Sequence, residues 1–286
     1  MKELARKVAV ITGAGSGIGA ALAEACAAEG MRVVAADVDA AGLAALVGRI
    51  EAAGGTAISQ PTDVRDRAAL ETLADRAWDA YGGCHLLCNN AGVMVNKPLL
   101  ELEEADWRWL LDVNLMGVVH GIGVFVPRMQ AQGGEAHVVN TASMAGLQAF
   151  AALGLGAYSA TKFAVVAVSE ILSQELEGTP IGVSVLCPGA VVTRIHESER
   201  VRPGEFAEAA PSSLATDANP EAVPGAQTPE EVARVVLSGV RAGRLHLITH
   251  PEMKAAVEGR HAAIAGAFDA AASQGGARPD RTGGTP

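Results

Sequence analysis

Three polar side chains near the middle of the chain have the types and the spacing that proton transfer needs. Tyr158 and Lys162 are four positions apart, so on a helix both side chains would lie on one face and meet. A phenol with a pKa near ~10 needs a neighbouring positive charge to act as an acid–base group at neutral pH, and an ammonium group supplies one. Ser143 lies 15 positions before Tyr158, just beyond a strand-like segment. Because a Tyr–Lys pair at this spacing is also common on helix surfaces, the surrounding elements decide the interpretation.

A glycine-rich segment, Thr12–Gly19 (TGAGSGIG), follows the first strand-like run and opens the first helical pattern. Glycines let the backbone approach a pyrophosphate, and a helix N-terminus offers free N–H groups and a positive dipole end. Asp37 ends the next strand-like run, 18 positions after Gly19, where an acid binds the hydroxyls of a ribose. Asp39 competes for that role. Because a carboxylate at Asp37 would repel a 2′-phosphate, these residues predict NAD rather than NADP as the cofactor.

The elements that must position these residues alternate between strand-like and helical patterns along the chain. Near-continuous apolar strands in such an alternation indicate a parallel sheet with helices on both faces. The expected strands are 7–12, 31–37, 56–60, 85–89, 136–141, 181–186 and 245–249, and the expected helices are 18–30, 40–53, 67–81, 103–129, 157–177, 229–242 and 252–272. The sequence therefore predicts an α/β protein with a doubly wound parallel sheet in three α/β/α layers.

Two segments depart from this alternation of strands and helices. Residues 194–227 hold four prolines and lack periodicity, which is typical of a functional lid or of disorder, and we expect a substrate-binding lid there. Residues 266–286 finish the last helix and run into a Gly- and Pro-bearing tail that we expect to be disordered. We expect one domain over residues 1–265.

Composition excludes several classes of protein. The chain has 286 residues, 49% of them hydrophobic, which is enough for a full core. A net charge of −10 opposes nucleic-acid binding. The cysteines (Cys26, Cys84, Cys88 and Cys187) lack metal-ligand spacing, so we expect no metal site and four reduced thiols. No apolar run reaches the ~18 residues of a membrane span and no signal peptide is visible, so we expect a cytoplasmic protein that does not cross a membrane.

Several motifs together resemble the short-chain dehydrogenase/reductase family, over about residues 5–200. Thr12–Gly19 resembles its cofactor loop, Asp63-Val64 its adenine contact, and Asn89–Gly92 (NNAG) the motif that braces its central strand. Pro188–Thr193 (PGAVVT) resembles the segment whose Thr contacts the nicotinamide carboxamide. Asn114, Ser143, Tyr158 and Lys162 match the family's catalytic tetrad, in the family's order. The resemblance implies a Rossmann fold and an oxidoreductase.

The resemblance also implies a role for each member of the tetrad. Tyr158 would be the base for alcohol oxidation and the acid for ketone reduction, with its pKa lowered by Lys162 and by the cofactor's positive charge. Lys162 would also bind the nicotinamide ribose, Ser143 would hold the substrate oxygen, and Asn114 would hold a water in a proton relay. The residues expected to contact the cofactor are Gly13, Ser16, Gly17, Ile18, Gly19, Asp37, Val38, Asp63, Val64, Asn90, Ala91, Gly92, Tyr158, Lys162, Pro188, Gly189, Val191 and Thr193.

The C-terminal part departs from the family's common pattern. Most bacterial members end with a glycine-rich strand that helps to form a tetramer, whereas here Leu245–Glu252 leads into a long helix. This departure favours a homodimer, through the helices that carry Asn114 and Tyr158, over a homotetramer. The interval between Ser143 and Tyr158 is also slightly long, and the extra residues fall in the apolar stretch Phe150–Gly156.

Three further segments are similar to the bacterial Cα-dehydrogenases that oxidise the benzylic alcohol of lignin-type aryl ethers: 114–129, 181–203 and 245–252. This similarity suggests a bulky, apolar secondary alcohol or its ketone as the substrate. His196 and Arg200 could meet a polar end of the substrate or could be solvated lid residues. The side chains expected to contact the substrate are Met94, Met144, Leu153, Leu155 and Ile195.

Together these features predict an NAD-dependent dehydrogenase or ketone reductase acting on an aryl, steroid, terpenoid or polyketide alcohol. Two alternatives stay open. One is a dinucleotide-sensing regulatory protein on the same fold, although the intact tetrad argues against it. The other is a dehydratase or epimerase that keeps its NAD bound.

Overall fold

Short apolar runs form the strands, and nearly every residue of the five inner strands of the sheet is buried because helices cover both sheet faces, whereas the two edge strands are only partly buried. The computed structural model describes residues 1–206 and 223–274. Within these residues a seven-stranded parallel sheet has the order β3-β2-β1-β4-β5-β6-β7. Its strands are β1 (Val8–Thr12), β2 (Arg32–Asp37), β3 (Thr56–Pro61), β4 (Leu86–Asn89), β5 (Ala136–Thr141), β6 (Ile181–Cys187) and β7 (His246–Ile248).

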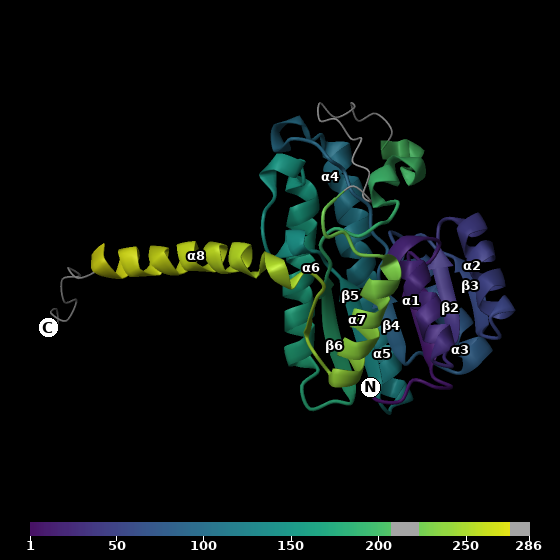
Figure 1. The fold of residues 1–286 in the computed structure, drawn as a ribbon. Coiled ribbons are helices and arrows are strands. Elements are labelled where there is room, and N and C mark those ends of the chain that lie inside the picture. Colours follow the sequence, from purple (N-terminus) through teal and green to yellow (C-terminus); the bar gives the residue numbers. More distant parts are fainter. Residues whose placement is uncertain (207–222, 275–286) are drawn as a thin grey trace, which may run out of the picture. The chain divides into compact units, whose positions relative to one another are not determined.

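Helices pack on the two faces of this sheet and give the three layers seen in Figure 1. Alternate strand residues point to opposite faces, so Ala9 and Ile11 belong to one apolar core and Val8 and Val10 to the other. One face carries α1 (Gly17–Ala28), α2 (Ala40–Ala52) and α7 (Pro229–Ala242). The other face carries α3 (Arg67–Tyr81), α4 (Glu104–Leu110), α5 (Gly117–Gln132) and α6 (Gly156–Glu175). The prediction of a doubly wound α/β fold is confirmed.

The strand order reverses between β1 and β4, which are neighbours in the sheet although two helix–strand units separate them in the chain. In open parallel sheets, ligands bind beyond the carboxyl ends of the strands at such a switch point. Thr12, Asn89 and Thr141 end β1, β4 and β5 at this edge. The fold therefore brings together the segments that carry the predicted cofactor loop and the predicted catalytic serine.

One expected helix, 103–129, is interrupted. α4 passes into a turn of π-helix, Leu111–Met116, before α5 continues to Gln132 with Pro127 inside it. A π turn accommodates one extra residue and is frequent at functional sites. This interruption changes the facing of the residues after α4, including Asn114.

The long helical stretch Glu104–Gln132 is also apolar enough to cross a membrane by length and composition. The expectation that no segment reaches this length is therefore wrong. However, 56% of its most apolar window is buried inside the fold, against α3 and the sheet. This burial is typical of a core helix.

The structure divides after Thr249 into two compact units. The second unit begins at His250 and contains α8 (Lys254–Gln274). Ile264 and Phe268 of this helix are 45% and 74% exposed. The predicted disordered tail lies outside the described residues from 275 onward.

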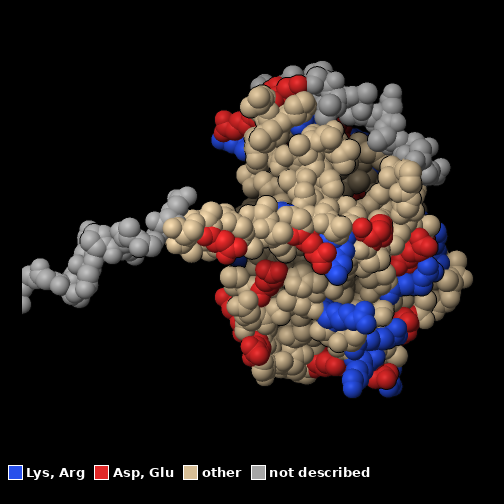
Figure 2. All heavy atoms as spheres, turned by 60° about the vertical axis from the view of Figure 1, so that its left-hand side comes forward, with Lys and Arg blue, Asp and Glu red and all other residues tan. Residues whose placement is uncertain are grey.

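Charged side chains of both signs are mixed on the surface. Figure 2 shows one face on which Lys and Arg gather in the lower part, with Asp and Glu among them. Ion pairs such as Lys7–Glu135 at 3.0 Å and Arg241–Glu29 at 2.5 Å join charges of opposite sign. The basic groups in these pairs are locally neutralised.

Candidate active site

The loop between β1 and α1 is fixed to the neighbouring strand by side-chain hydrogen bonds. The Thr12 hydroxyl accepts the N–H groups of Asn90 and Ala91 at 3.0 and 3.1 Å. In return, the Asn90 amide donates to the Thr12 carbonyl at 3.1 Å, and its oxygen accepts the Thr141 hydroxyl at 3.2 Å. The segment after β4 therefore ties together the ends of β1 and β5.

Glycines keep this loop narrow. Gly13 has a φ of +66°, and a Cβ on it would lie 2.7 Å from the Ala91 Cα atom. A Cβ on Gly19 would lie 2.0 Å from the Gly13 carbonyl oxygen. A side chain at either position would force the loop apart, so the turn over the start of α1 needs glycine at both.

The start of α1 suits a pyrophosphate. The Ala20 N–H donates to the Ser16 carbonyl, so the N–H groups of the first turn point out of the helix toward the loop. The Ser16 side chain makes no capping bond with them. Free N–H groups and the positive end of the helix dipole bind anions. These features fit the phosphate groups of a dinucleotide.

Asp37 stands beside the same loop at the end of β2. Its carboxylate accepts the Gly15 N–H at 2.8 Å and the Asp39 N–H at 2.9 Å. The side chain of Asp39 instead accepts the Gly42 N–H and caps α2. The structure thus separates the two candidate acids: Asp37 faces the glycine loop, and Asp39 is a helix cap.

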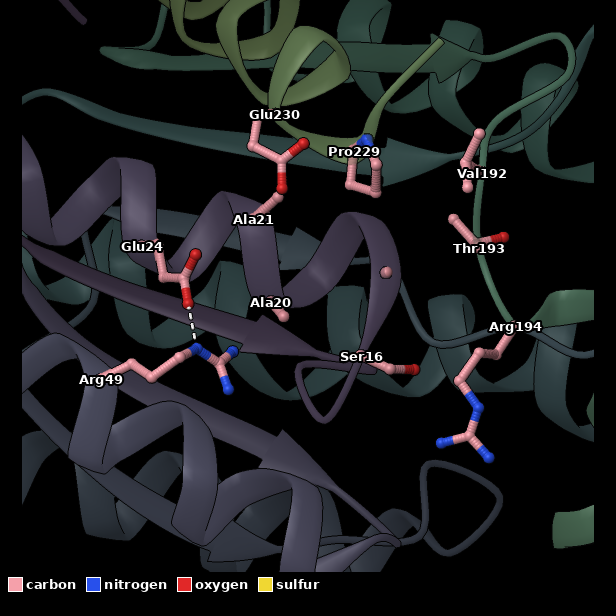
Figure 3. A pocket seen from close by; sticks show the side chains of 11 residues that line it. Ser16, Ala20, Ala21, Glu24, Arg49, Val192, Thr193, Arg194, Pro229 and Glu230 are labelled. Atoms are coloured by element: carbon pink, nitrogen blue, oxygen red, sulfur yellow. Dashed lines mark hydrogen bonds and ion pairs between the residues drawn. The ribbon is translucent and has the colours of Figure 1, made fainter. Parts of the chain in front are cut away.

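A cavity of about 410 Å³ opens next to the loop. In Figure 3, Ser16 lies at the start of α1, and Thr193 and Arg194 lie on the facing segment after β6. Arg49 and Glu24 pair across α1 and α2 at 2.6 Å. The predicted cofactor residues Ser16, Gly17 and Thr193 therefore share one cavity.

The segment after β6 is held in place on both sides. The Met144 N–H donates to the Pro188 carbonyl at 2.8 Å, and the Gly189 N–H donates to the Thr249 hydroxyl at 3.2 Å. Val191 forms a β-bridge with Gln227. This bridge joins Gln227, the last residue of the predicted lid, to the chain just before the lid begins. Residues 207–222 of the predicted lid lie outside the described residues.

The other predicted cofactor contacts lie around this edge. Val38 follows Asp37 and is 53% exposed. Val64 is buried, and the His120 ring bonds to its carbonyl at 3.1 Å. Ile18 packs against the core under α1.

Asn114 is buried on the π turn and binds the backbone of the segment after β4. Its side-chain oxygen accepts the Val93 N–H at 2.8 Å, and its amide donates to the Val93 carbonyl at 2.9 Å. The amide also reaches the Thr161 hydroxyl on α6 at 3.3 Å. A Cβ on Gly92 would lie 3.3 Å from the Asn114 oxygen and 3.5 Å from Lys162 Nζ. Asn114 and Lys162 therefore both lie close to Gly92.

Ser143, Tyr158 and Lys162 converge beyond the end of β5. The Ser143 side chain hydrogen-bonds with the Tyr158 hydroxyl. Lys162 Nζ donates to the Thr141 carbonyl at 2.8 Å and lies 5.5 Å from the centre of the Tyr158 ring. Tyr158 and Lys162 are one helical turn apart on α6, and both are buried. The structure brings together the three residues that the spacing singled out.

Burial sets the protonation of this group. It raises the pKa of Tyr158 to about 12, although the hydrogen bond with Ser143 acts in the opposite direction. Burial lowers the pKa of Lys162 to about 8. At neutral pH the phenol keeps its proton and the amine is charged. The expected lowering of the Tyr158 pKa by Lys162 is absent from the protein alone.

Four of the predicted substrate contacts, Met94, Met144, Leu155 and Ile195, are apolar side chains in or near the core cluster that contains Tyr158, and they are called the apolar wall. Leu155 is buried in the same core cluster, and Met94 and Ile195 pack against it. Met144 is buried in the turn that follows Ser143. Leu153 differs, because it is 55% exposed and lies at the rim rather than in the wall.

Three charged residues that belong to none of the sequence motifs form a cluster that supports this wall. Asp106 is buried and accepts hydrogen bonds from Lys97 at 2.8 Å and from Arg202 at 2.7 Å. Burial alone would raise the pKa of Asp106, but these two cations lower it below its usual value. The guanidinium of Arg202 also lies 4.4 Å from the centre of the Trp109 ring. Arg202 is 96 positions from Asp106 in the sequence, and Lys97 is nine positions from it, outside any shared helix; none of the three belongs to a motif, so no local signal could have paired them.

The described residues of the chain contain no group of three or more His, Cys, Asp or Glu placed to hold a metal ion. All four cysteines are free and buried.

A nucleotide-type loop at the switch point, next to a Ser–Tyr–Lys group, defines a class of dinucleotide-dependent oxidoreductases. Residues 7–203 match the model of the short chain dehydrogenase family, and the chain belongs to this short-chain dehydrogenase/reductase family. A short chain dehydrogenase/reductase from Burkholderia phymatum, solved in complex with NAD, is 42% identical, with a TM-score of 0.87 over 92% of this chain and 96% of that one.

Two curated relatives are also similar. The C alpha-dehydrogenase of Sphingobium sp. is 34% identical over 272 residues, 92% of this chain and 87% of that protein. The 1-deoxy-11-beta-hydroxypentalenate dehydrogenase of Streptomyces avermitilis is 41% identical over 193 residues, 67% and 71% of the two chains. The resemblance to Cα-dehydrogenases that the sequence suggested is confirmed.

Proposed function

We propose that the protein is an NAD-dependent oxidoreductase that interconverts a bulky, apolar secondary alcohol and its ketone. The observation that carries the proposal is the pairing of the Ser143 hydroxyl with the buried Tyr158 hydroxyl, with the buried Lys162 one turn away on α6. A sensor of dinucleotides has no use for a proton donor and acceptor placed among apolar side chains. The cytoplasmic location expected from the sequence is part of this proposal.

The residues of the chain handle the proton and the substrate oxygen. Ser143 would hold that oxygen by a hydrogen bond, next to the Tyr158 hydroxyl that gives or takes its proton. The Lys162 charge stabilises the phenolate left after proton donation, and the bond to the Thr141 carbonyl keeps its ammonium in place. Asn114 fixes the backbone at Val93, beside the pocket. A bound nicotinamide supplies the hydride acceptor or donor.

The cofactor part of the proposal rests on the glycine loop and Asp37. Gly13 and Gly19 let the loop pack closely over the start of α1, where a pyrophosphate would bind, and Asp37 presents a carboxylate where a ribose would lie. The same carboxylate would repel a 2′-phosphate. The B. phymatum neighbour was solved with NAD, which agrees with this choice.

The substrate part rests on the apolar wall. Met94, Met144, Leu155 and Ile195 offer apolar surface near Tyr158, which favours a substrate with a large hydrocarbon or aryl group. Two of the curated relatives are named as a C alpha-dehydrogenase and a 1-deoxy-11-beta-hydroxypentalenate dehydrogenase.

The experiment is NADH formation, followed by absorbance, with a panel of bulky benzylic and alicyclic secondary alcohols. NAD and NADP are run side by side, and Tyr158→Phe is the control. We expect NAD-dependent turnover that falls about 10²- to 10⁴-fold in the variant, because general acid–base catalysis contributes about that much. Near-wild-type turnover in Tyr158→Phe would refute the proposed role. NAD binding with no turnover on any alcohol or ketone would favour a sensor.

We also propose a homodimer through the helices that carry Asn114 and Tyr158. Leu111, Met116 and Val119 around the π turn are each 37% exposed, and Ile171 on α6 is 56% exposed. Exposed apolar side chains on neighbouring helices are typical of an interface. Light scattering after size-exclusion chromatography tests this proposal, with Ile171→Glu expected to shift a dimer toward monomer. An unchanged mass for Ile171→Glu, or a wild-type monomer, would count against it.

A further inference from the structure

The apolar stretch before α6 ends in residues 153–155, which pair with residues 93–97 after β4. The backbone of Lys97 forms an isolated parallel β-bridge with Leu155. We call these two segments the clip. They carry two members of the apolar wall, Met94 on one segment and Leu155 on the other. The geometry of the clip therefore determines how these two wall residues lie relative to each other.

Burial alternates along the first segment of the clip. Val93, Val95 and Lys97 are buried, whereas Met94 and Asn96 are only partly buried. Alternate side chains of an extended segment point to opposite sides, so a slip of one residue would exchange the two sets. Met94 would then turn into the core, and a valine would take its place in the wall. The composition of the wall thus depends on the register of this segment.

The pairing within the clip is short. The Lys97 N–H donates to the Gly154 carbonyl at 3.0 Å, and the Asn96 side-chain amide donates to the Leu153 carbonyl at 3.1 Å. The second of these bonds is exposed. Each such bond gains little over a hydrogen bond with water, so this pairing alone holds the register weakly.

The Lys97 side chain supplies a stronger constraint. It is buried, and its Nζ atom donates to the buried Asp106 carboxylate on α4 at 2.8 Å. α4 packs against α6 near the upper end of the structure in Figure 1. A slip of one residue would turn the Lys97 side chain to the opposite side, away from Asp106. Both charges would then lose a partner, which is strongly unfavourable inside a protein.

We infer that Lys97 is a positioning residue that fixes the register of the clip and thereby determines which bulky alcohols the substrate pocket accepts. This inference rests on the proposed function, because it takes Met94 and Leu155 as substrate contacts. Apolar side chains often replace a buried ion pair without loss of stability, and the best-attested use of such a pair is to select one arrangement of the chain. That use explains why an amine is buried at this position.

The catalytic group is anchored by bonds that involve no residue of the clip. Lys162 donates to the Thr141 carbonyl at 2.8 Å, and the Tyr158 carbonyl accepts the Thr161 hydroxyl at 2.7 Å. The Tyr158 hydroxyl pairs with Ser143. A loosened clip should therefore change the fit of the substrate more than the transfer of its proton.

Steady-state kinetics with two related alcohols tests the inference. Diphenylmethanol and 1-phenylethanol are both benzylic, and the second lacks one phenyl group. The test variant is Lys97→Met, which keeps an unbranched side chain and removes the charge. For diphenylmethanol we expect KM to rise about 10-fold or more, as for other changes in the packing of an apolar pocket. We expect kcat, and KM for 1-phenylethanol, to change less than about threefold.

A second variant and a control separate positioning from loss of stability. Asn96→Ala removes the exposed bond to the Leu153 carbonyl and leaves the Lys97–Asp106 pair in place. It should change the ratio of the two KM values in the same direction, by about two- to threefold. The control, Ile50→Ala, opens a cavity in the core on the other face of the sheet. It should lower stability and leave the ratio unchanged.

Hydrogen–deuterium exchange of the full chain reads the clip without any substrate. The amide of residue 97 is bonded across the clip, and the amides of β5 serve as the reference for global unfolding. Relative to that reference, we expect exchange at residue 97 to be faster in Lys97→Met and in Asn96→Ala than in the wild type. In Ile50→Ala it should be unchanged.

Three results would overturn the inference while leaving the proposed function intact. They are an unchanged KM for diphenylmethanol in Lys97→Met, an equal rise in KM for both alcohols, and exchange at residue 97 as slow as in the wild type. Absence of NAD-dependent turnover of both alcohols by the wild type would instead count against the proposed function, and the exchange measurement would still decide whether Lys97 fixes the clip.

Discussion

The two halves of the candidate site are built by different means. Around β1 and β2 the cofactor loop is shaped by backbone: Gly13 and Gly19 pack against main-chain atoms, and Thr12 binds main-chain N–H groups. Around the substrate wall the structure is held by charged side chains, with Asp106 buried between Lys97 and Arg202. The cofactor half depends on close contact between backbone segments, and the substrate half depends on the pairing of buried opposite charges.

This difference predicts which kind of substitution disrupts each half of the site. A backbone cradle is disturbed by added volume, and the effect stays local because the strands beneath it are fully paired. A buried charge cluster is disturbed by removing one member, because the remaining charges lose their partner in a medium of low polarity. Substitutions of each kind can separate the two behaviours.

The largest effect on stability is expected from Asp106→Asn. This change keeps the volume but leaves Lys97 and Arg202 without their buried carboxylate, and breaking a buried pair costs about 3–5 kcal/mol. The free energy of unfolding from urea denaturation measures it. The matched control is Glu104→Gln, which breaks the exposed pair with Arg108 on the same helix. We expect that control to change stability by less than about 1 kcal/mol. Equal effects of the two substitutions would contradict the role given to the cluster.

A smaller effect, confined to the cofactor half, is expected from Gly19→Ala. Its Cβ would lie 2.0 Å from the Gly13 carbonyl oxygen, so the loop must shift, at a cost of about 1–3 kcal/mol. NAD affinity, measured by calorimetry, should fall about 10- to 100-fold. Gly48 on α2 is the control, because a Cβ there meets nothing within 4 Å. Gly48→Ala should leave NAD binding unchanged and raise stability by up to about 1 kcal/mol.

The pH dependence of turnover should come from the substrate half. Lys162 has a pKa lowered to about 8 by burial, and Tyr158 has one raised to about 12. Below pH 8 the ammonium is charged and the phenol can donate its proton, so ketone reduction should be independent of pH. Above pH 8 the charge that stabilises the phenolate is lost, and the rate should fall about tenfold per pH unit. A reduction rate that stays constant from pH 7 to 10 would show that Lys162 does not act through its charge.

The smallest effect is expected from Asp37→Asn. The amide oxygen can still accept the Gly15 N–H, so the loop should keep its shape. The lost charge should weaken NAD binding about threefold to tenfold and improve NADP binding, because the 2′-phosphate is no longer repelled. Parallel titrations with NAD and NADP measure the ratio. An unchanged ratio would mean that the choice between the cofactors is made elsewhere.

The sequence was sufficient for the half that is built from backbone. Strand and helix patterns located the sheet because buried parallel strands are continuous apolar runs, and the glycine loop is recognised by its composition. Ser143, Tyr158 and Lys162 could be grouped because a helix fixes the i to i+4 relation and the sheet edge fixes the third residue. In this half, local rules determine the geometry.

The other half could not be predicted in this way. Lys97, Asp106 and Arg202 meet through tertiary packing alone, and Arg65 contacts a residue 140 positions away. The Tyr158 pKa of the protein alone could not be predicted for a related reason. The direction of the pKa shift depends on how deeply the Tyr158 ring is buried, and the spacing of residues in the sequence does not give that burial. The π turn was missed because its residues fit an ordinary helical pattern.

That π turn makes the length of one helix part of the chemistry. A π turn holds one more residue than an α-helical turn, so deleting one residue from Leu111–Met116 would convert it to α-helix while α4 and α5 keep nearly the same orientation. The residues inside the turn would rotate instead, and Asn114 would lose its bonds to the Val93 backbone. Substitutions can be tolerated along this stretch, whereas an insertion or deletion of one residue cannot. Descendants of this sequence can therefore change the residue types of the π turn but must keep its number of residues.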